Sequence, residues 1–464
     1  MVLFPYADTS EPRYAEIARI MATTGDWITP WFEPGKPFWG KPPLSFWFQA
    51  IFIKLFGVAE WTARLPSWLA MLATSWVIYK CGLEYAGRRA AFWAFAIYAT
   101  CALPYISSGA VLTDPYLVLG TTLCMAGFLH ASTACRLLGF LGLAIGLLAK
   151  GPLALVLVLG PIMMCLLVFR KKFWPPIPVS TLVLGLGLVT LLVVPWYVLA
   201  ELKTPGFLDY FIVGEHFRRY LDPGWAGDIY GSAHLKPYGS IWPLWILATF
   251  PWGIIGLVIA INSLLRKRAQ QFVFSAVKDV KTFYFVSWAF FTLIFFTFAG
   301  NILWTYVLPA IPAFAILLGK KISDGSKWKE LSSKFSMVII ASSLLIPTAI
   351  LGLTIAVNHN INILKTEKDL ADYVVNDKSH DNEIWYINSR PFSARYYSNG
   401  NAKLVKPDEF DQKLSHTKTE RIYVAVPKEM AKDFKEQHLE SKSWELIPQA
   451  SSRRFELLRI VLSK

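Results

Sequence analysis

The 464-residue chain has little of what soluble enzymes commonly use. Only 17% of its residues are charged, and its five cysteines all lie in or beside apolar runs. No disulfide framework and no spacing of metal ligands is visible, and there is no glycine loop that would cradle a nucleotide. Met1–Tyr6 is too short for the apolar core of a typical signal peptide. These absences exclude a disulfide-stabilised secreted domain and disfavour nucleotide-dependent chemistry.

Apolar and aromatic residues are abundant instead. Hydrophobic residues make up 54% of the chain, and its 19 Trp, 19 Tyr and 32 Phe are typical of aromatic belts at two membrane interfaces. The formal charge of +14 does not indicate nucleic-acid binding, because the basic residues fall in short clusters between apolar runs. The sequence therefore predicts an integral membrane protein, surrounded by membrane lipids, with no nucleic-acid partner.

Apolar runs dominate residues 1–358 and predict a transmembrane domain. About ten of them are long enough, or nearly so, to cross a hydrocarbon core of about 30 Å as helices. The run at 137–150 is short enough to be a partial span. The runs fall near 59–80, 88–107, 113–133, 137–150, 152–169, 178–200, 240–263, 282–299, 302–319 and 336–357.

Four basic clusters indicate the orientation of these runs. If the runs simply alternate across the membrane, all four clusters lie on one side, which the positive-inside tendency makes cytoplasmic. The clusters are Arg88–Arg89, Arg170–Lys172, Arg266–Arg268 and Lys320–Lys321. The outer side then holds residues 8–58, the turn at 108–114, the loop at 201–239 and everything after 358. An N-terminus that starts outside has no span before it, so we expect a leading transmembrane helix to be missing.

Two short helices are expected in the first outer loop. Ser10 is placed to cap a helix whose apolar stripe runs from Tyr14 to Met21. The pair Pro42–Pro43 opens a second helix over 44–56. Both helices are amphipathic and too short or too polar to span, so we expect them to lie in the membrane interface. The alternative is that they are ordinary loop helices packed on the bundle.

Residues 359–464 differ in composition from the rest of the chain. They are rich in Lys, Asp and Glu, and strand-like runs alternate with polar helical stretches. The strand-like runs are 383–387, 421–426 and 455–461, and the helical stretches lie near 366–375 and 427–437. This pattern predicts a small extracytoplasmic α/β domain with one sheet. It contains no catalytic motif, so we expect it to pack over the outer loops or to help recognise an acceptor.

Three acidic residues are candidates for catalysis, because ionisable groups at a membrane boundary are costly unless they are paired or solvated. Asp8 and Glu11, with Arg13 beside them, lie just outside the membrane. Either carboxylate is placed to act as a general base that takes a proton from an acceptor hydroxyl or amine. Asp114 lies on the same face, between two apolar runs. Helix capping is the structural alternative for these acids.

Several basic residues on the outer face run against the positive-inside tendency. Lys41 precedes a double proline, Lys150 ends an apolar run, and His234 and Lys236 come just before another run. Together they suit the phosphate or pyrophosphate head group of a lipid whose tail stays in the bilayer. The alternative is that lysines at helix ends extend to the interface without binding anything.

Tyr306 lies in a run that Pro309 and Pro312 interrupt, so its helix is kinked and backbone carbonyls are freed. Its hydroxyl is a candidate donor to a phosphate, and a place in an aromatic belt is the alternative. Glu215 and His216, with Arg218 and Arg219 in the same charged loop, are secondary candidates for the border of the same cavity. The alternative is that this loop is simply solvated.

Taken together, these segments resemble the family 39 glycosyltransferases, polytopic enzymes that use polyprenyl-phosphate sugars and include the bacterial aminoarabinose transferases. The ordered match comprises Glu11-x-Arg13-Tyr14-Ala15-Glu16-Ile17, Gly25-Asp26-Trp27, Gly40-Lys41-Pro42-Pro43, Thr113-Asp114, Lys150-Gly151-Pro152, Glu215-His216 and Tyr306-x-x-Pro309. The resemblance implies a helical membrane fold of the GT-C type. It also implies an acidic catalytic residue at Asp8 or Glu11 with Asp114 nearby, the lipid phosphate at Lys41, and the histidine of the large outer loop at His234.

Two departures from the family pattern bear on the site. Relatives often have adjacent Asp-Glu where this chain has Asp8-Thr9-Ser10-Glu11, so the base is either acid. The aminoarabinose enzymes have Glu before the lysine, where this chain has Gly40. If that glutamate helps to bind a divalent metal, this chain lacks the ligand. The same change argues against aminoarabinose as the sugar that is transferred.

The site residues and the resemblance predict an inverting transfer of a sugar from a polyprenyl-phosphate donor, such as undecaprenyl phosphate, to an envelope acceptor. The acceptor is lipid A, another glycan or a protein, and the reaction takes place at the outer face of the bacterial inner membrane. A transporter or flippase for a lipid-linked or anionic substrate is the alternative, since it also needs polar residues and proline-broken helices. The candidates gather at one face instead of the midplane, which favours the transferase.

Overall fold

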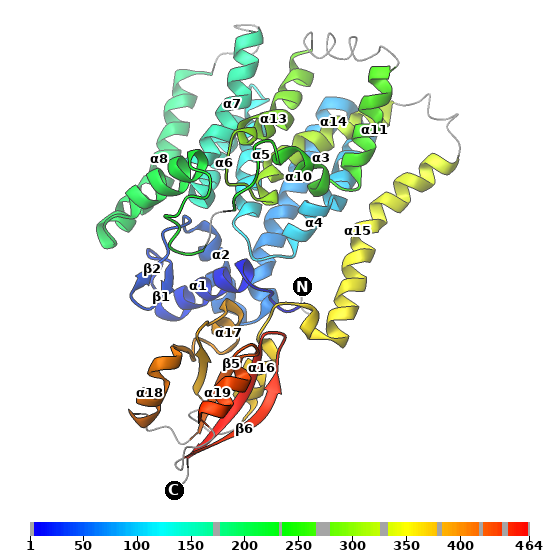
Figure 1. Ribbon diagram of the computed structural model, residues 1–464. Coiled ribbons are helices and arrows are strands. Elements are labelled where there is room, and N and C mark those ends of the chain that lie inside the picture. Colours follow the sequence, from blue (N-terminus) through cyan, green and yellow to red (C-terminus); the bar gives the residue numbers. More distant parts are fainter. Residues whose placement is uncertain are drawn as a thin grey trace.

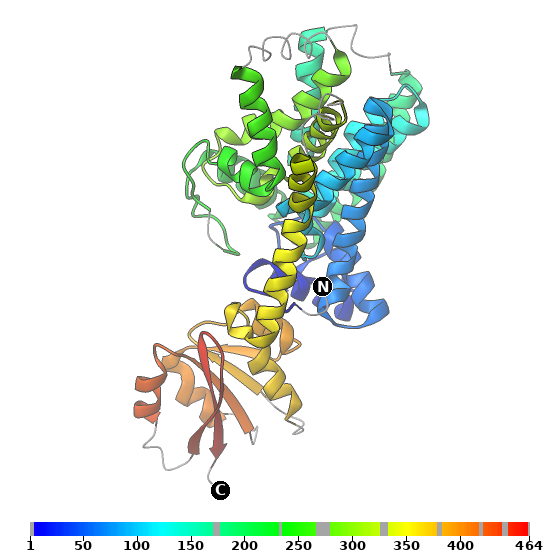
Figure 2. The ribbon, with the colours of Figure 1, turned by 90° about the vertical axis from the view of Figure 1, so that its right-hand side faces the viewer.

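In the computed structural model the chain forms three layers (Figures 1 and 2). A bundle of helices lies at one end, the elements of the first outer loop form a middle layer, and a small domain with a sheet lies at the other end. Helix α15 (Ser333–His359) runs beside the bundle towards the small domain. The structure describes residues 4–169, 177–231, 234–265, 279–324, 333–377, 383–416, 421–438 and 444–462.

The bundle and its loops contain the apolar helices that the sequence predicts. By length and hydropathy, six described helices qualify as membrane spans, and up to eight qualify if each of two bent pairs is one span. The bent pairs are α3 with α4, at 68°, and α10 with α11, at 114°. The elements are α3 (Glu60–Thr100), α4 (Ala102–Ser108), α5 (Asp114–Phe128), α6 (Thr133–Lys150), α7 (Pro152–Phe169), α8 (Val179–Lys203), η2 (Asp209–Arg218), α9 (Arg219–Leu221), α10 (Ile241–Ala248), α11 (Trp252–Leu265), α13 (Val280–Thr297), η3 (Trp304–Ala310) and α14 (Ile311–Asp324).

Two features account for the difference between this number and the ten expected spans. Helix α3 contains the first two apolar runs as two segments that meet at Gly87. The chain folds back there, at a glycine whose φ is 82°. Gly82 then lies so close to the returning segment that a Cβ on it would come within 2.9 Å of the Ala91 Cα. Helix α5 has only 15 residues, which is short for a core of about 30 Å. The run at 137–150, by contrast, belongs to the 18-residue α6, which is long enough to span.

Two of the four basic clusters share the end of the bundle that lies away from the small domain (Figure 1). Lys320 donates to the Tyr85 hydroxyl at 3.2 Å, beside the turn of α3 that carries Arg88–Arg89. Glu60, at the start of α3, instead pairs with a lysine of the small domain. The other two clusters lie outside the described residues, at 170–172 and 266–268.

Glycines bring α5 and α6 into close antiparallel contact. A Cβ on Gly120 would come within 2.6 Å of backbone atoms of Gly142 and Gly146. Small residues let membrane helices approach this closely. Because α5 begins at Asp114 and α6 ends at Lys150, antiparallel packing places these two charged residues at the same end of the helix pair.

Both expected helices of the first outer loop form. Helix α1 begins at Ser10, so its N-cap is Thr9, and the prediction that Ser10 caps the helix is wrong by one residue. The buried face of α1, which includes Tyr14, packs against α2 and the small domain. Helix α2 exposes Leu55 and Phe56, as the expected position in the membrane interface requires. The elements are α1 (Ser10–Thr24), β1 (Trp31–Glu33), β2 (Lys36–Pro37) and α2 (Leu44–Phe56).

The C-terminal domain has one five-stranded sheet in the order β4-β3-β5-β7-β6. Strands β4, β3 and β5 are parallel, whereas β7 runs antiparallel to β5 and β6. The expected strand-like runs are β3, β5 and β7. The domain contains η5 (Ile361–Ile363), α16 (Lys368–Asn376), β3 (Glu383–Ile387), α17 (Phe392–Tyr397), β4 (Ala402–Val405), η6 (Pro407–Glu409), α18 (Phe410–His416), β5 (Arg421–Pro427), α19 (Ala431–His438), β6 (Trp444–Ser451) and β7 (Phe455–Leu462).

Candidate active site

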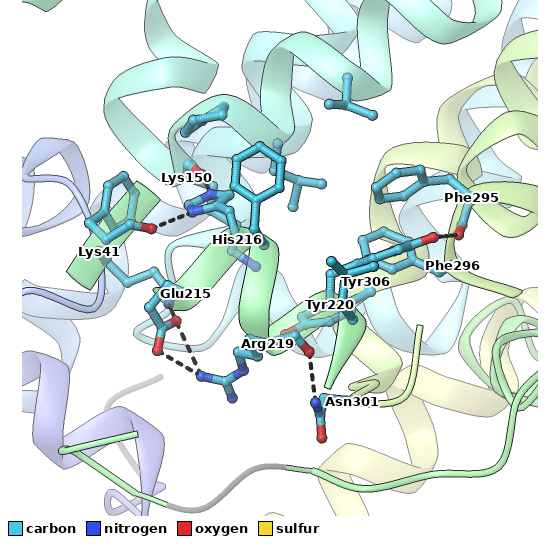
Figure 3. A pocket seen from close by; sticks show the side chains of 16 residues that line it. Lys41, Lys150, Glu215, His216, Arg219, Tyr220, Phe295, Phe296, Asn301 and Tyr306 are labelled. Carbon is cyan, nitrogen blue, oxygen red and sulfur yellow. Dashed lines mark hydrogen bonds and ion pairs between the residues drawn. The ribbon is translucent and has the colours of Figure 1, made fainter. Parts of the chain in front are cut away.

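A cavity of about 370 Å³ lies where the outer loops meet the bundle. Side chains from distant segments line it, and in Figure 3 Lys41, Glu215 and Arg219 lie opposite Phe295 and Phe296. Its polar lining residues are Lys41, Lys150, Glu215, His216, Arg219, Asn301 and Tyr306. The remaining lining residues are Pro152, Leu153, Val156, Phe211, Phe217, Tyr220, Leu221, Phe295 and Phe296. The cavity thus combines a cluster of cations with a mainly apolar surface.

Glu215, on η2, joins two of these cations. Its carboxylate accepts hydrogen bonds from Lys41 Nζ at 3.1 Å and from Arg219 Nη1 at 2.9 and 3.1 Å. Burial raises the pKa of the Glu215 carboxyl, but the charges of Lys41 and Arg219 and their hydrogen bonds outweigh this and hold the pKa at about 2. Glu215 is therefore an anion that fixes two cations, and it is a poor proton acceptor.

The low pKa of Glu215 predicts how its contribution to stability depends on pH. A carboxyl whose pKa is lowered by folding stabilises the folded protein above its unfolded pKa, and this contribution is lost as the pH falls towards the folded value. Glu215→Gln should therefore melt at a lower temperature than the wild type at pH 7. The difference between the two melting temperatures should narrow as the pH falls from about 4.5, the ordinary pKa of the carboxyl, towards about 2, its pKa in the folded protein. Melting curves in detergent between pH 7 and pH 3 test this. A constant difference contradicts the expectation.

Lys150 and Asp114 form a buried ion pair beside the cavity. Lys150 Nζ lies 2.7 Å from Asp114 Oδ1, and the two side chains are only 8% and 9% exposed. Lys150 Nζ also lies 5.2 Å from the centre of the Tyr306 ring, within the range of a cation–π contact. Lys150 and Tyr306 therefore line the cavity together, and Asp114 contacts its wall through Lys150.

Contacts to the backbone hold η2 and α9 against the bundle. The ring nitrogens of His216 lie 2.7 and 2.9 Å from the carbonyl oxygens of Phe211 and Lys150. Burial lowers the pKa of His216 despite these contacts, so the neutral ring, which donates through one nitrogen only, is favoured. Asn301 Nδ2 donates to the Arg219 carbonyl at 2.7 Å. His216 and Asn301 thus fix the chain that presents the cations.

The sequence gives Arg219 a low rank among the candidate cavity residues, and it gives no signal for Asn301. Arg219 stands beside Arg218 in a charged loop, and charged loops are usually just solvated. The structure exposes Arg218 and turns Arg219 towards Glu215 and the cavity. The one signal in the sequence is the spacing of Glu215 and Arg219, because an acid and a base four residues apart lie on the same helical face.

Asp8 does not line the cavity. Its carboxylate accepts hydrogen bonds from the Ser393 backbone and hydroxyl, each at 2.8 Å, and it is also paired with Arg454. Both partners belong to the C-terminal domain. Asp8 therefore joins the start of the chain to this domain.

Glu11 also has structural partners away from the cavity lining. Its two oxygens each lie 3.0 Å from a nitrogen of the buried Arg64. It also accepts from the Val111 amide at 3.0 Å, in the turn that leads to Asp114. Glu11 thus helps to fix the position of that turn.

Three further candidates lie around the outer loops. Arg13 Nη1 donates to the Tyr230 carbonyl at 2.9 Å. His234 and Lys236 are exposed and do not line the cavity, although the backbone of Lys236 bonds to Gly300 at 3.0 Å. The structure therefore brings Lys41, Lys150, Tyr306 and the secondary candidates Glu215 and His216 together. It places Asp8, Glu11, Arg13, His234 and Lys236 elsewhere.

No group of three or more His, Cys, Asp or Glu side chains is placed to hold a metal ion among the residues that the structure describes. At Gly40, where the aminoarabinose enzymes have a glutamate, a Cβ would come within 2.9 Å of the Phe38 ring. Phe38 is buried among other aromatic rings. A longer side chain at position 40 therefore requires this ring to move.

Comparisons with known proteins identify similar sequences and similar folds. Residues 1–211 match the profile of the family described as dolichyl-phosphate-mannose-protein mannosyltransferase. The undecaprenyl phosphate-alpha-4-amino-4-deoxy-L-arabinose arabinosyl transferases of Aeromonas hydrophila and Aeromonas salmonicida are each 30% identical to this chain over 334 residues. These alignments cover 69% of this chain and 56% of each relative. The chain thus spans little more than half the length of these relatives.

Solved structures share the fold. ArnT from Cupriavidus metallidurans, solved with undecaprenyl phosphate bound, matches with a TM-score of 0.78 at 18% identity, over 99% of this chain and 94% of that chain. The archaeal oligosaccharyltransferase AglB from Archaeoglobus fulgidus matches with a TM-score of 0.52 at 11% identity, over 92% of this chain and 66% of that chain. The fold is therefore that of the polytopic GT-C glycosyltransferases. The resemblance to the aminoarabinose-transferase-like members, which use polyprenyl-phosphate sugars, is confirmed.

Proposed function

We propose that this chain transfers a sugar from a polyprenyl phosphate to an acceptor of the bacterial envelope, with inversion at the anomeric carbon. The observation that carries this proposal is the composition of the cavity, where Lys41 and Arg219 face an apolar surface that includes Phe295 and Phe296. An amphiphile with a phosphate head and a prenyl tail fits such a surface. Undecaprenyl phosphate is the donor lipid that we infer, because ArnT was solved with it bound.

The cations retain hydrogen-bond donors for this phosphate. Lys41 Nζ donates to the Gly40 carbonyl and to Glu215, and an ammonium group has three donors. Arg219 donates to Glu215 and Asp228 through Nη1, which leaves the donors on Nη2 without a partner in the described part of the chain. We infer that these two groups, with the Tyr306 hydroxyl, bind the donor phosphate. Lys150 contributes a further positive charge at the same wall.

The reaction then needs an acceptor nucleophile and a base. The acceptor oxygen or nitrogen attacks the anomeric carbon, the bond from this carbon to the phosphate oxygen breaks, and the lipid phosphate leaves with the electron pair. Cations that meet the developing charge stabilise this transition state. The acceptor proton goes to a carboxylate, and among Asp8, Glu11 and Asp114 we favour Asp114, because it is in contact with a residue of the cavity wall. Asp8 and Glu11 then act by holding the outer loops.

We infer that the protein lies in the bacterial inner membrane with its C-terminal domain outside the cytoplasm. The two described basic clusters lie at the end of the bundle away from that domain, as the positive-inside tendency requires. A cysteine in place of the exposed Lys403 should react with a membrane-impermeant maleimide in intact spheroplasts. Labelling only after lysis contradicts this orientation.

Transfer assays test the proposed activity directly. Proteoliposomes that contain the protein receive a radiolabelled polyprenyl-phosphate sugar and an envelope extract as acceptor. We expect label to become covalently attached to an acceptor while the polyprenyl phosphate is released. Movement of intact donor across the bilayer without any covalent product supports the transporter and refutes the transferase.

A further inference from the structure

Among the described residues, the ion pairs that join the C-terminal domain to the outer loops and to the start of α3 share one polarity of charge. On the side of the outer loops the groups are carboxylates, at Asp8, Glu33 and Glu60. On the side of the C-terminal domain they are cations. These are Arg454, Arg390 with Arg395, and Lys368. The C-terminal domain therefore packs against α1 and the β1–β2 hairpin (Figure 1). In each ion pair of this contact, the C-terminal domain supplies the cation.

The pairs at Glu33 reach the hairpin that leads to the cavity. Arg390 Nη2 lies 2.7 Å from Glu33 Oε1, and Arg395 Nη1 lies 3.4 Å from the same oxygen. Arg395 also donates to the Phe32 carbonyl and lies 4.9 Å from the centre of the Phe32 ring. Arg395, in α17, and Arg390, just before it, therefore hold both the backbone and the side chains of β1.

Tyr230 connects this hairpin to the chain segment that carries Lys41. The Tyr230 hydroxyl donates to the Pro37 carbonyl at 2.7 Å and accepts from the Trp39 amide at 2.9 Å, two residues before Lys41. The Tyr230 ring also packs 5.2 Å from that of Phe32, centre to centre. A shift of the hairpin therefore moves the residues that lead directly to Lys41.

The same tyrosine is also connected to the second cation of the donor site. The Tyr230 amide donates to Asp228 at 2.9 Å, and Asp228 lies 3.3 Å from Arg219 Nη1. Arg219 in turn shares Glu215 with Lys41. The contacts thus run without a break from Arg395 through the hairpin and Tyr230 to both cations.

We propose that α17 with the preceding Arg390 is a positioning element of the donor site. By holding the β1–β2 hairpin at Glu33, the C-terminal domain sets Lys41 and Arg219 for the donor phosphate. This inference rests on the proposed function and adds a role for a domain that carries no catalytic motif. Arg390 and Arg395 act through other residues and do not touch the substrate.

Reversal of one charge at a time tests this role. Glu33→Arg and Arg390→Glu each place like charges at the contact, and both side chains are partly exposed, so we expect the fold to tolerate the change. We expect each variant to raise the KM for the polyprenyl-phosphate sugar about 5- to 20-fold while kcat changes less than about twofold. The double variant restores opposite charges between positions 33 and 390, while Arg395 stays positive beside them, so its KM should fall well below that of Glu33→Arg.

A matched control separates positioning from general damage to the domain. Lys403 pairs with Glu383 at 2.6 Å within the C-terminal domain, so Lys403→Glu reverses a charge there without touching the hairpin. We expect this variant to keep the wild-type KM. If the single reversals unfold the domain, the milder Glu33→Gln removes the attraction without adding a like charge. The KM of this variant then tests the positioning role. An unchanged KM in Glu33→Gln, or a double variant no better than the singles, overturns the proposal.

The same assay distinguishes this inference from the proposed function. Lys41→Met is measured in parallel, with undecaprenyl-phosphate-linked sugar as the probe. Lost transfer in Lys41→Met together with an unchanged KM in the reversals refutes the positioning role and leaves the transferase intact. Wild-type transfer in Lys41→Met refutes the donor site itself, whatever the reversals do.

Discussion

Lys41→Met is expected to lower the rate of sugar transfer roughly 100- to 1,000-fold, the usual cost of removing one group that stabilises developing charge. Lys41 lines the cavity, and its ammonium group has one donor left beyond those bound to Gly40 and Glu215. Methionine keeps the length and the apolar contacts of the side chain while it removes the charge. Arg219 stays in place, so we expect residual activity. Initial rates of transfer in proteoliposomes measure the effect.

The control for this variant is the same substitution at an exposed lysine. Lys403→Met removes a charge from the surface of the C-terminal domain, and we expect it to transfer sugar at the wild-type rate. Lys41→Met should insert into the membrane and melt close to the wild type, because Glu215 keeps its second partner, Arg219. Transfer by Lys41→Met at the rate of Lys403→Met would contradict the assignment of Lys41 to the donor phosphate.

Much of the fold follows from local patterns. Helix α2 begins and ends where the sequence predicts, because a proline pair precedes it and a glycine follows it. Three strands of the C-terminal sheet are also predicted, since their apolar residues are bounded by polar ones. Strand β4 is a short edge strand, and β6 is interrupted by Pro448, so neither has a strong pattern of its own. The alternation of the first two apolar runs predicts a chain reversal between them, and the structure places this turn at Gly87.

The site is predictable where topology brings residues together. Asp114 begins one helix and Lys150 ends the next, so a simple helical hairpin is enough to pair them. The sequence places Lys41 and Tyr306 on the same membrane face in the same way. Arg219 is different, because the choice between it and Arg218 depends on which way the short η2 and α9 segment faces.

Asp8 shows what local patterns cannot supply. The sequence indicates a carboxylate just outside the membrane, and the general base is a reasonable expectation for it. Its partners Ser393 and Arg454 lie 385 and 446 residues away, in a different domain. No spacing or periodicity carries information over such a distance. The C-terminal domain therefore adds a docking role for the first outer loop to the catalytic role predicted from its sequence.

Asp114→Asn is expected to destabilise the protein more than replacement of both members of its ion pair. Removal of one partner from a buried pair typically costs about 3–5 kcal/mol, because the other charge stays buried without compensation. Here Lys150 would keep its charge at a site where its side chain is 8% exposed. The double variant Asp114→Asn with Lys150→Met leaves no such charge, and we expect its melting temperature to return close to that of the wild type. Thermal melting in detergent measures both.

The double variant also separates a structural pair from a functional one. Lys150 lines the cavity, and Asp114 is the acid that we favour as the base, so we expect the double variant to be folded but to transfer sugar at least about 100-fold more slowly than the wild type. A variant that is both stable and fully active would show that the pair only holds α5 and α6 together. A wild-type melting temperature in Asp114→Asn alone would show that water or a neighbouring group already compensates Lys150. The melting temperature reports on the buried unpaired charge, whereas the rate of transfer reports on the loss of a base or a cation at the site. The two measurements together therefore show whether this ion pair takes part in the chemistry.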